Sequence, residues 1–313
     1  MRVLTVWDPR CHCEASGRLL STRKQKAVVE AALAEGLITV VGSVSFDTDA
    51  VWADIARVHA PSYVSAVRTG EPRELAESQS FAWSPEFADS VVRIWHGHQV
   101  AARLALREGL VLHPVSGAHH ADYDHGWAFC TFNYLVGAGR ALLEQGAVTR
   151  VAIVDLDAHI GDGTLALVRE DPRFGLFDIA GYSRAIGTLN STRHVFESAE
   201  DTDEYFTALK KLPAFLDAFR HGLVFYQAGM DSYERDEAGA VKGMTGERLG
   251  QRDRYVLEAV ISREIPTVVN LAGGYLDDGT TVRLHVGTIR IASEVLSELG
   301  TGSSGGAIDD GCQ

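Results

Sequence analysis

The chain has 313 residues, 46% of them hydrophobic and 23% charged, which suits one large α/β domain or two smaller ones. Its formal net charge of −13 argues against direct binding to nucleic acid or to an anionic membrane, and it favours a cationic partner. Four scattered cysteines, at positions 11, 13, 130 and 312, exclude a disulfide framework, and no apolar run approaches the length of a membrane span.

The first ten residues, MRVLTVWDPR, do not have the charged and apolar regions of a signal peptide. Together with the low cysteine content, this predicts a protein of the reducing cytoplasm. The oligomeric state cannot be inferred from the sequence.

Short apolar runs alternate with amphipathic stretches along the chain. The predicted strands are Val3–Trp7, Leu37–Val41, Leu110–His113, Arg150–Asp155, Phe174–Ile179, Leu223–Ala228 and Thr267–Leu271. The predicted helices are Ser21–Gly36, Pro85–Gly109, Thr131–Gly146, Asp203–His221, Thr245–Arg263 and Thr281–Leu299. This alternation predicts an α/β fold of three αβα layers with a mainly parallel central sheet. Since no linker or repeat divides the chain, we expect one domain over residues 1–299 and a flexible tail over 300–313.

Four clusters of polar residues follow four of the predicted strands. They lie at 113–125, at 155–162, at Asp231 and at Tyr275. Ligands of parallel sheets bind beyond the carboxyl ends of the strands, so we expect these four loops to form one site.

The segment DLDAHIGDGT (155–164) predicts a metal site. On extended backbone, Asp157 and His159 point to the same side, and Asp231 at the end of another strand is a third candidate ligand. Two carboxylates and one neutral imidazole balance a dication and leave a position open for water, as in catalytic sites. The alternative is that Asp157 caps a helix beginning near Gly161 and that His159 is a surface histidine.

The segment GAHHADYDHGWAFC (117–130) carries two adjacent histidines. Beside a metal, His119 and His120 can supply an electrostatic partner and a general base. Asp155 and Asp162 then each orient one of them. The alternative is a polar surface loop.

The segment LAGGYLDD (271–278) places a tyrosine after two glycines. Gly273 and Gly274 allow the backbone to approach a bound ligand, which makes Gly273 a candidate for substrate contact. The hydroxyl of Tyr275 can donate to an oxyanion that develops during a reaction. The alternative is a tyrosine packed at the edge of a loop.

Taken together, these segments resemble the zinc-dependent histone deacetylase family, which has the arginase/deacetylase fold. VHAPSYVSAV (58–67) and QAGMDSYERDEAG (227–239) also match motifs of the family, so five segments occur in the family's order. The loop spacings most resemble class IV-like bacterial histone deacetylase-like amidohydrolases. Residues 1–299 are then the catalytic domain.

The resemblance implies a cofactor and a set of ligands. Asp157, His159 and Asp231 would bind one Zn²⁺ per chain. A monovalent cation, often K⁺, would lie near the backbone of Asp155, Asp157 and His159.

The resemblance also implies roles in the reaction. His120, paired with Asp162, would be the general base, and His119, paired with Asp155, its electrostatic partner. Tyr275 would polarise the carbonyl of the substrate.

The implied reaction removes an acetyl or other acyl group from a lysine side chain or lysine-like amine. Phe129 would form one wall of the substrate tunnel, with Tyr182 a candidate for the opposite wall. Around 79–87 there is no clear counterpart of the rim aspartate that grips a peptide, and Trp83 is instead expected to shape the mouth of the tunnel. Acetylated polyamines and other small N-acyl amines are therefore an alternative substrate class.

Two rival functions fit the sequence less well. A binuclear manganese ureohydrolase needs further carboxylates, where this chain has Gly161 and Tyr233. A non-catalytic acyl-binding module would be expected to lose a ligand or the tyrosine, and the sequence keeps them.

Overall fold

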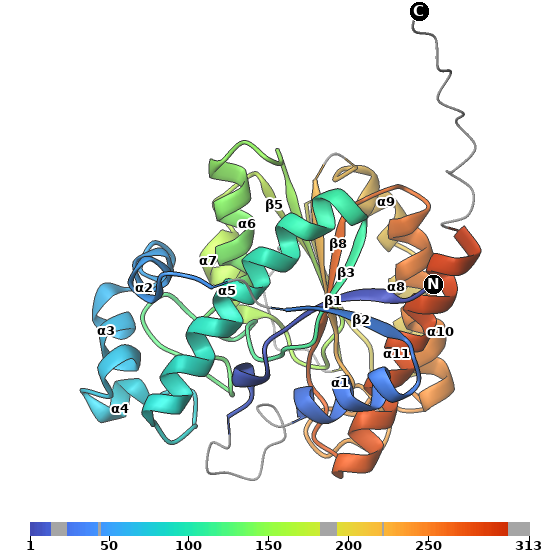
Figure 1. The fold of residues 1–313 in the computed structure, drawn as a ribbon. Coiled ribbons are helices and arrows are strands. Elements are labelled where there is room, and N and C mark those ends of the chain that lie inside the picture. Colours follow the sequence, from blue (N-terminus) through green and yellow to red (C-terminus); the bar gives the residue numbers. More distant parts are fainter. Residues whose placement is uncertain (14–23, 43–44, 182–192, 221, 300–313) are drawn as a thin grey trace, which may run out of the picture.

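The computed structural model describes residues 1–13, 24–42, 45–181, 193–220 and 222–299 (Figure 1). Tyr182 and the segment 300–313, for which we predicted a tunnel wall and a flexible tail, lie outside the described residues. No helix of the described part is long and apolar enough to cross a membrane.

A single eight-stranded parallel sheet forms the centre of the molecule, in the order β2-β1-β3-β8-β7-β4-β5-β6. Its strands are β1 (Val3–Trp7), β2 (Ile38–Gly42), β3 (Leu110–His113), β4 (Val151–Asp155), β5 (Phe174–Ala180), β6 (His194–Ser198), β7 (Leu223–Ala228) and β8 (Thr267–Leu271). The predicted parallel sheet is confirmed.

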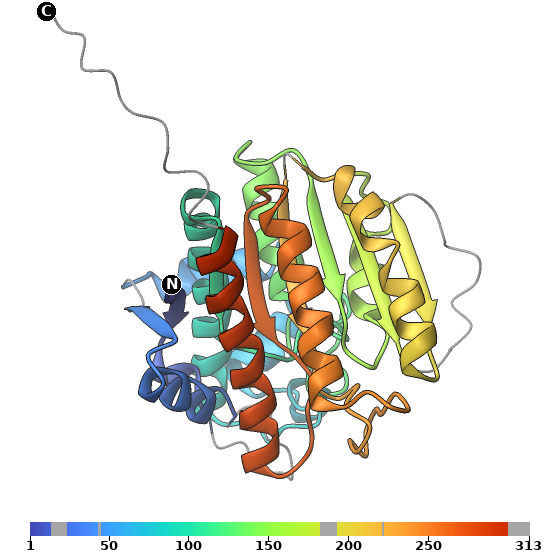
Figure 2. The same ribbon diagram turned by 90° about the vertical axis from the view of Figure 1, so that its right-hand side faces the viewer.

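Helices cover both faces of the sheet (Figures 1 and 2). They are the short 3-10 helix η1 (Pro9–Cys11), α1 (Lys24–Ala34), α2 (Thr48–Ile55), α3 (Pro61–Thr69), α4 (Arg73–Ala76), α5 (Pro85–Glu108), α6 (Tyr134–Glu144), α7 (Asp162–Val168), α8 (Thr202–Leu209), α9 (Leu212–Asp217), α10 (Gly246–Ile261) and α11 (Asp278–Leu299). One core cluster lies between the sheet and α1, α10 and α11, and a second lies under α5 and α6. The three expected layers are therefore present.

The long helix α5 shows how local sequence sets the bounds of an element. The Ser84 hydroxyl accepts a hydrogen bond from the Phe87 backbone N–H at 3.1 Å, and Pro85 occupies the first turn. Gly109, with φ of 84°, ends the helix in a conformation that other residues rarely adopt.

One row of polar side chains crosses the sheet at the carboxyl ends of five neighbouring strands. The row consists of His113, Asn270, Gln227, Asp155 and Asp178, which are paired by register and are all buried. The strands are otherwise almost wholly apolar, as expected for a sheet covered on both faces. The row marks where the core ends and the polar loops begin.

Candidate metal centre

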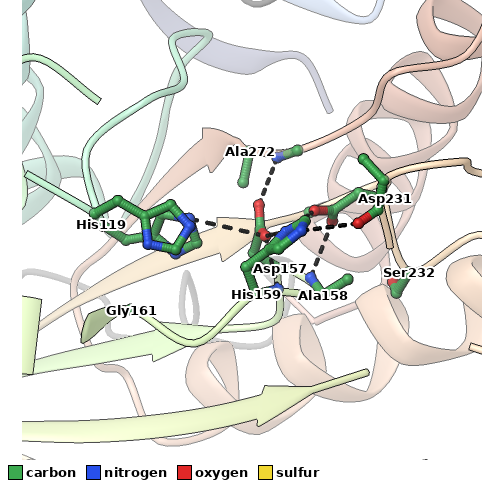
Figure 3. A network of polar contacts seen from close by, with 12 residues as sticks. His119, Asp157, Ala158, His159, Gly161, Asp231, Ser232 and Ala272 are labelled. Carbon is green, nitrogen blue, oxygen red and sulfur yellow. Dashed lines mark hydrogen bonds and ion pairs between the residues drawn. The ribbon is translucent and has the colours of Figure 1, made fainter. Parts of the chain in front are cut away.

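Asp157, His159 and Asp231 converge on one point beyond the sheet (Figure 3). His159 Nδ1 lies 3.0 Å from Asp157 Oδ1 and 2.9 Å from Asp231 Oδ2. The three ligand atoms lie within 4.8 Å of one another, and both aspartates are buried. The structure therefore brings together the three ligands expected from the sequence.

The local backbone differs from the expected extended stretch. Strand β4 ends at Asp155, and the chain then bends. Asp157 Oδ1 accepts the His159 backbone N–H at 3.0 Å, so this side chain turns the chain after itself and brings the imidazole alongside. Asp157 does not cap α7, whose N-cap residue is Gly161 and whose first turn receives no side-chain cap.

Backbone contacts between loops fix the two carboxylates. Asp231 Oδ1 accepts from the Ala158 N–H at 3.0 Å, and Asp157 Oδ2 accepts from the Gly273 N–H at 2.7 Å. A Cβ atom at position 273 would lie 2.2 Å from Asp231 Oδ2, so only glycine fits there. Gly273 thus approaches a candidate ligand closely.

The hydrogen bonds of His159 fit a bound cation. Its Nε2 lies 2.9 Å from the Ala238 carbonyl oxygen and donates to it, so Nδ1, which faces two carboxylates, is the nitrogen that would bind either a proton or a cation. Three acceptors facing one point need a positive charge between them. A tetrahedral ion with bonds of about 2 Å is typical of Zn²⁺ held by Asp and His.

The pKa values of Asp231 and His159 also indicate that this group can bind a cation. Burial and the charge of Asp157 raise the pKa of Asp231 to about 7. Burial opposes protonation of His159, but its hydrogen bonds to Asp157 and Asp231 outweigh this effect and raise its pKa to about 12. Without a metal, a proton on His159 therefore balances one of the two carboxylates, and a bound cation would take the place of that proton.

Two histidine–carboxylate pairs stand beside these three residues. His119 Nδ1 lies 2.9 Å from Asp155 Oδ2, and its Nε2 lies 3.8 Å from Asp157 Oδ1. His120 Nδ1 lies 2.6 Å from Asp162 Oδ1. The imidazole centroids are 4.1 Å apart, so the charge on one histidine acts strongly on the other.

The pKa values of the two histidines are shifted in opposite directions. Burial disfavours the charged form of His119, but Asp155 and Asp157 more than compensate and raise its pKa to about 10. Burial and the charge of His119 lower the pKa of His120, against the pull of Asp162. At neutral pH, His119 is a cation and His120 is neutral.

The loop that carries Tyr275 is held by residues that the sequence analysis missed. Asp236 Oδ2 accepts from the Tyr275 backbone N–H at 2.8 Å, and the ammonium of Lys24 donates to the Ala272 carbonyl. Lys24 is buried and lies 6.0 Å from the centroid of the Tyr275 ring. Burial and the charges of Asp157 and Asp231 raise the pKa of Tyr275 well above its usual value, which keeps the hydroxyl protonated.

Phe129 lies beside Tyr275, with 6.2 Å between ring centroids, and packs against Phe81 at 5.5 Å. Its backbone N–H donates to Gln79 O at 3.0 Å. The segment 79–87 therefore holds Phe129, the predicted wall of the substrate tunnel, through the ring of Phe81 and the carbonyl of Gln79. The indole N–H of Trp83, in contrast, donates to the Val67 carbonyl, and the guanidinium of Arg73 lies over the indole ring.

An apolar cavity of about 40 Å³ adjoins Phe129 and Gly117. Its walls also include Phe87, Val91, Trp95 and Phe132. Ala118, next to Gly117, is fully buried.

The profile of the histone deacetylase domain matches residues 18–287, which is most of the chain. The chain belongs to the histone deacetylase family. Members of this family are generally metal-dependent, which agrees with the group formed by Asp157, His159 and Asp231.

Sequence matches to individual proteins are consistent with membership of this family. An uncharacterised protein of Picosynechococcus sp. is 31% identical over 233 residues, which cover 72% of this chain and 76% of that protein. Histone deacetylase 2 of Arabidopsis thaliana is 26% identical over 245 residues, covering 73% of this chain and 62% of the plant protein.

Among solved structures, acetylpolyamine aminohydrolase from Burkholderia pseudomallei has a TM-score of 0.74 to this chain. The match covers 95% of this chain and 99% of the other, at 19% sequence identity. It confirms the predicted arginase/deacetylase fold. The histone deacetylase family match supports an enzyme of the deacetylase and amidohydrolase class.

Proposed function

We propose that the chain is a zinc-dependent amidohydrolase that removes an acetyl or other acyl group from a lysine side chain or lysine-like amine. The observation that carries the proposal is the convergence of Asp157, His159 and Asp231, with the two histidine–carboxylate pairs beside them. A metal, a general base and an oxyanion donor are the parts that hydrolysis of an amide requires.

In this proposal Asp157, His159 and Asp231 hold one zinc ion. When bound, zinc polarises the amide carbonyl and lowers the pKa of a ligating water. Two carboxylates and a neutral imidazole leave the site without net charge and keep one position open to substrate.

His120 acts as the general base and then as the general acid. Its Nδ1–H donates to Asp162 at 2.6 Å, which leaves the Nε2 lone pair free to take a proton from the attacking water. His119 stays protonated beside Asp155, and its charge keeps His120 neutral before the attack.

Tyr275 donates a hydrogen bond from its hydroxyl to the oxygen of the substrate carbonyl as negative charge develops there. Asp236 fixes the backbone N–H of the tyrosine and Lys24 fixes the Ala272 carbonyl three residues before it, so the donor is positioned before substrate arrives. Phe129 packs against the acyl-bearing chain of the substrate.

A small cationic N-acyl amine, such as an acetylated polyamine, is the second candidate substrate. The net charge of −13 attracts a cation, and the solved structure with the shared fold is named for acetylpolyamine hydrolysis. The apolar cavity beside Phe129 is the reason to test longer acyl chains as well.

The test is a mass-spectrometric deacylation panel on zinc-loaded protein, with acetyl-lysine peptides, long-acyl lysine peptides and acetylated polyamines. We expect turnover of one class, which is lost in Tyr275→Phe. Zinc-loaded protein that cleaves none of them would contradict the proposal.

A further inference from the structure

Arg252 on α10 is fully buried beneath the two loops that carry the candidate metal ligands. Its Nη1 donates to the Gly229 carbonyl at 2.6 Å, to the Leu156 carbonyl at 3.2 Å and to Ser232 Oγ at 3.2 Å. Leu156 precedes Asp157, and Ser232 follows Asp231. One guanidinium therefore joins the carboxyl ends of β4 and β7 at the residues next to the ligands.

The charge of Arg252 is balanced, and its place is fixed, by the next residue. Asp253 Oδ1 lies 2.9 Å from Arg252 Nε and 2.8 Å from Nη2. The same carboxylate accepts from the Tyr226 hydroxyl at 2.5 Å and from Thr288 Oγ1 at 2.6 Å. The pair is thereby tied to strand β7 and to helix α11.

A buried ion pair of this kind is a poor way to gain stability alone. Removing a guanidinium and a carboxylate from water costs several kcal/mol, and apolar residues of similar volume often stabilise a core better. Arg252 instead directs its donors at loop atoms that an apolar side chain would leave unsatisfied.

The two loops touch each other closely. A Cβ atom at Gly229 would lie 2.5 Å from Asp157 Cα and 3.0 Å from Asp231 Oδ1. A change in the spacing of these backbones would therefore move the two carboxylates relative to each other.

We propose that Arg252 is a positioning residue, which sets the distance between the loops of Asp157 and Asp231 and so the geometry of the metal site. The inference rests on the metal site of the proposed function. Groups that orient ligands from behind typically contribute about 10- to 100-fold to metal affinity.

The test is the affinity of each folded variant for Zn²⁺, measured by competition with a chromophoric chelator, together with the Co²⁺ absorption spectrum. Arg252→Lys keeps the charge and loses the planar fork. The double variant R252Q/D253N removes both charges, so that no buried charge is left unpaired. Arg254→Gln is the matched control, because Arg254 lies on the same helix but pairs with exposed Glu294 and Glu298.

We expect about tenfold weaker Zn²⁺ binding and an altered Co²⁺ spectrum in both Arg252 variants, at a temperature where circular dichroism shows them folded. The Arg254 variant should bind like wild type. Wild-type affinity and an unchanged spectrum in either folded Arg252 variant would reduce Arg252 to a purely structural role. A wild-type protein that binds neither ion would overturn the proposed metal site itself, and this inference with it.

Discussion

At the scale of single residues, the site depends on two neighbouring histidines that carry different charges at the same pH. His119 and His120 are adjacent in sequence, yet Asp155 and Asp157 keep the first protonated while burial and its neighbour's charge keep the second neutral. Because their pKa values are separated, the two like side chains carry different charges at one pH, so that His120 can act as a base while His119 supplies a fixed positive charge.

The pH dependence of activity follows from this separation. The acidic limb of kcat/KM should titrate below the ordinary histidine pKa of 6.5, because burial and His119 lower the pKa of His120. Asp162 raises that pKa, so Asp162→Asn should move the limb to still lower pH while reducing the rate. Asp124→Asn, which alters the exposed pair of Asp124 with His125, is the control and should leave the limb in place. A limb that moves upward in Asp162→Asn would refute the pairing.

The hydroxyl of Tyr275 should affect kcat far more than KM, because it is needed where negative charge develops. We expect Tyr275→Phe to lower kcat by about 10²- to 10³-fold, as for other oxyanion donors, with zinc content unchanged. Steady-state kinetics and elemental analysis measure both quantities. Tyr123→Phe, in an exposed tyrosine, is the control. Equal turnover by Tyr275→Phe and wild type would remove Tyr275 from the reaction.

The sequence located the candidate ligands because each follows a recognisable strand. It missed Lys24, Asp236 and Phe81, whose partners are far away in the chain or lie in irregular loops. Lys24 contacts a carbonyl 248 residues away, and nothing in the pattern around it predicts a buried ammonium. The roles of the site residues remain predictions.

At the scale of elements, local pattern predicted long segments well and short ones poorly. Seven strands were predicted, but β6 was missed because HVFES is short and partly polar and lies at an edge of the sheet. The predicted helix Asp203–His221 is two helices, α8 and α9, with Lys210 and Lys211 between them and Pro213 in the first turn of the second. The short helices α2, α3 and α4 were not predicted, whereas α7 begins near Gly161 as one alternative expected.

The turn Trp127–Cys130, which contains the wall residue Phe129, is strained. Trp127 and Cys130 exchange backbone hydrogen bonds across Ala128 and Phe129, which have φ of 41° and 68°. Two successive positive φ values are typical of type I′ turns, which favour Asn and Gly. The chain therefore holds the Phe129 ring in place at a cost in backbone energy.

Ala128→Gly should relieve part of this strain. We expect the free energy of unfolding to rise by about 0.5–1 kcal/mol, since the relief of about 1–2 kcal/mol exceeds the entropy that glycine loses. Ala166→Gly, at an exposed position within α7, should instead lower it by about 1 kcal/mol. Denaturant unfolding measures both, and a loss of stability in Ala128→Gly would show that the turn is not strained.

At the scale of the whole molecule, the sheet order explains how distant segments form one site. Strands β3, β8, β7 and β4 are consecutive neighbours in the sheet, and their carboxyl ends carry the tandem histidines, Tyr275, Asp231 and Asp157 respectively. The alternating pattern predicted a parallel sheet, and the structure confirms it. The order of the strands depends on long-range pairing, which the sequence pattern does not contain.

Because the buried carboxylates repel each other, zinc should stabilise the entire fold. At a free zinc concentration about 1,000 times Kd, ligand binding adds about 4 kcal/mol to the free energy of unfolding. We expect a higher Tm for the zinc-loaded protein than for the chelated one. Asp231→Ala should abolish this difference, and a Tm shift that persists in the variant would place the ion elsewhere.

The central claim is that one zinc ion, held by Asp157, His159 and Asp231, is required for amide hydrolysis. Titration of metal-free protein with Zn²⁺, with released amine followed at each step, tests it most directly. We predict that activity rises from zero and saturates at one equivalent per chain. Full activity in the metal-free protein, or saturation only at two equivalents, would contradict the account.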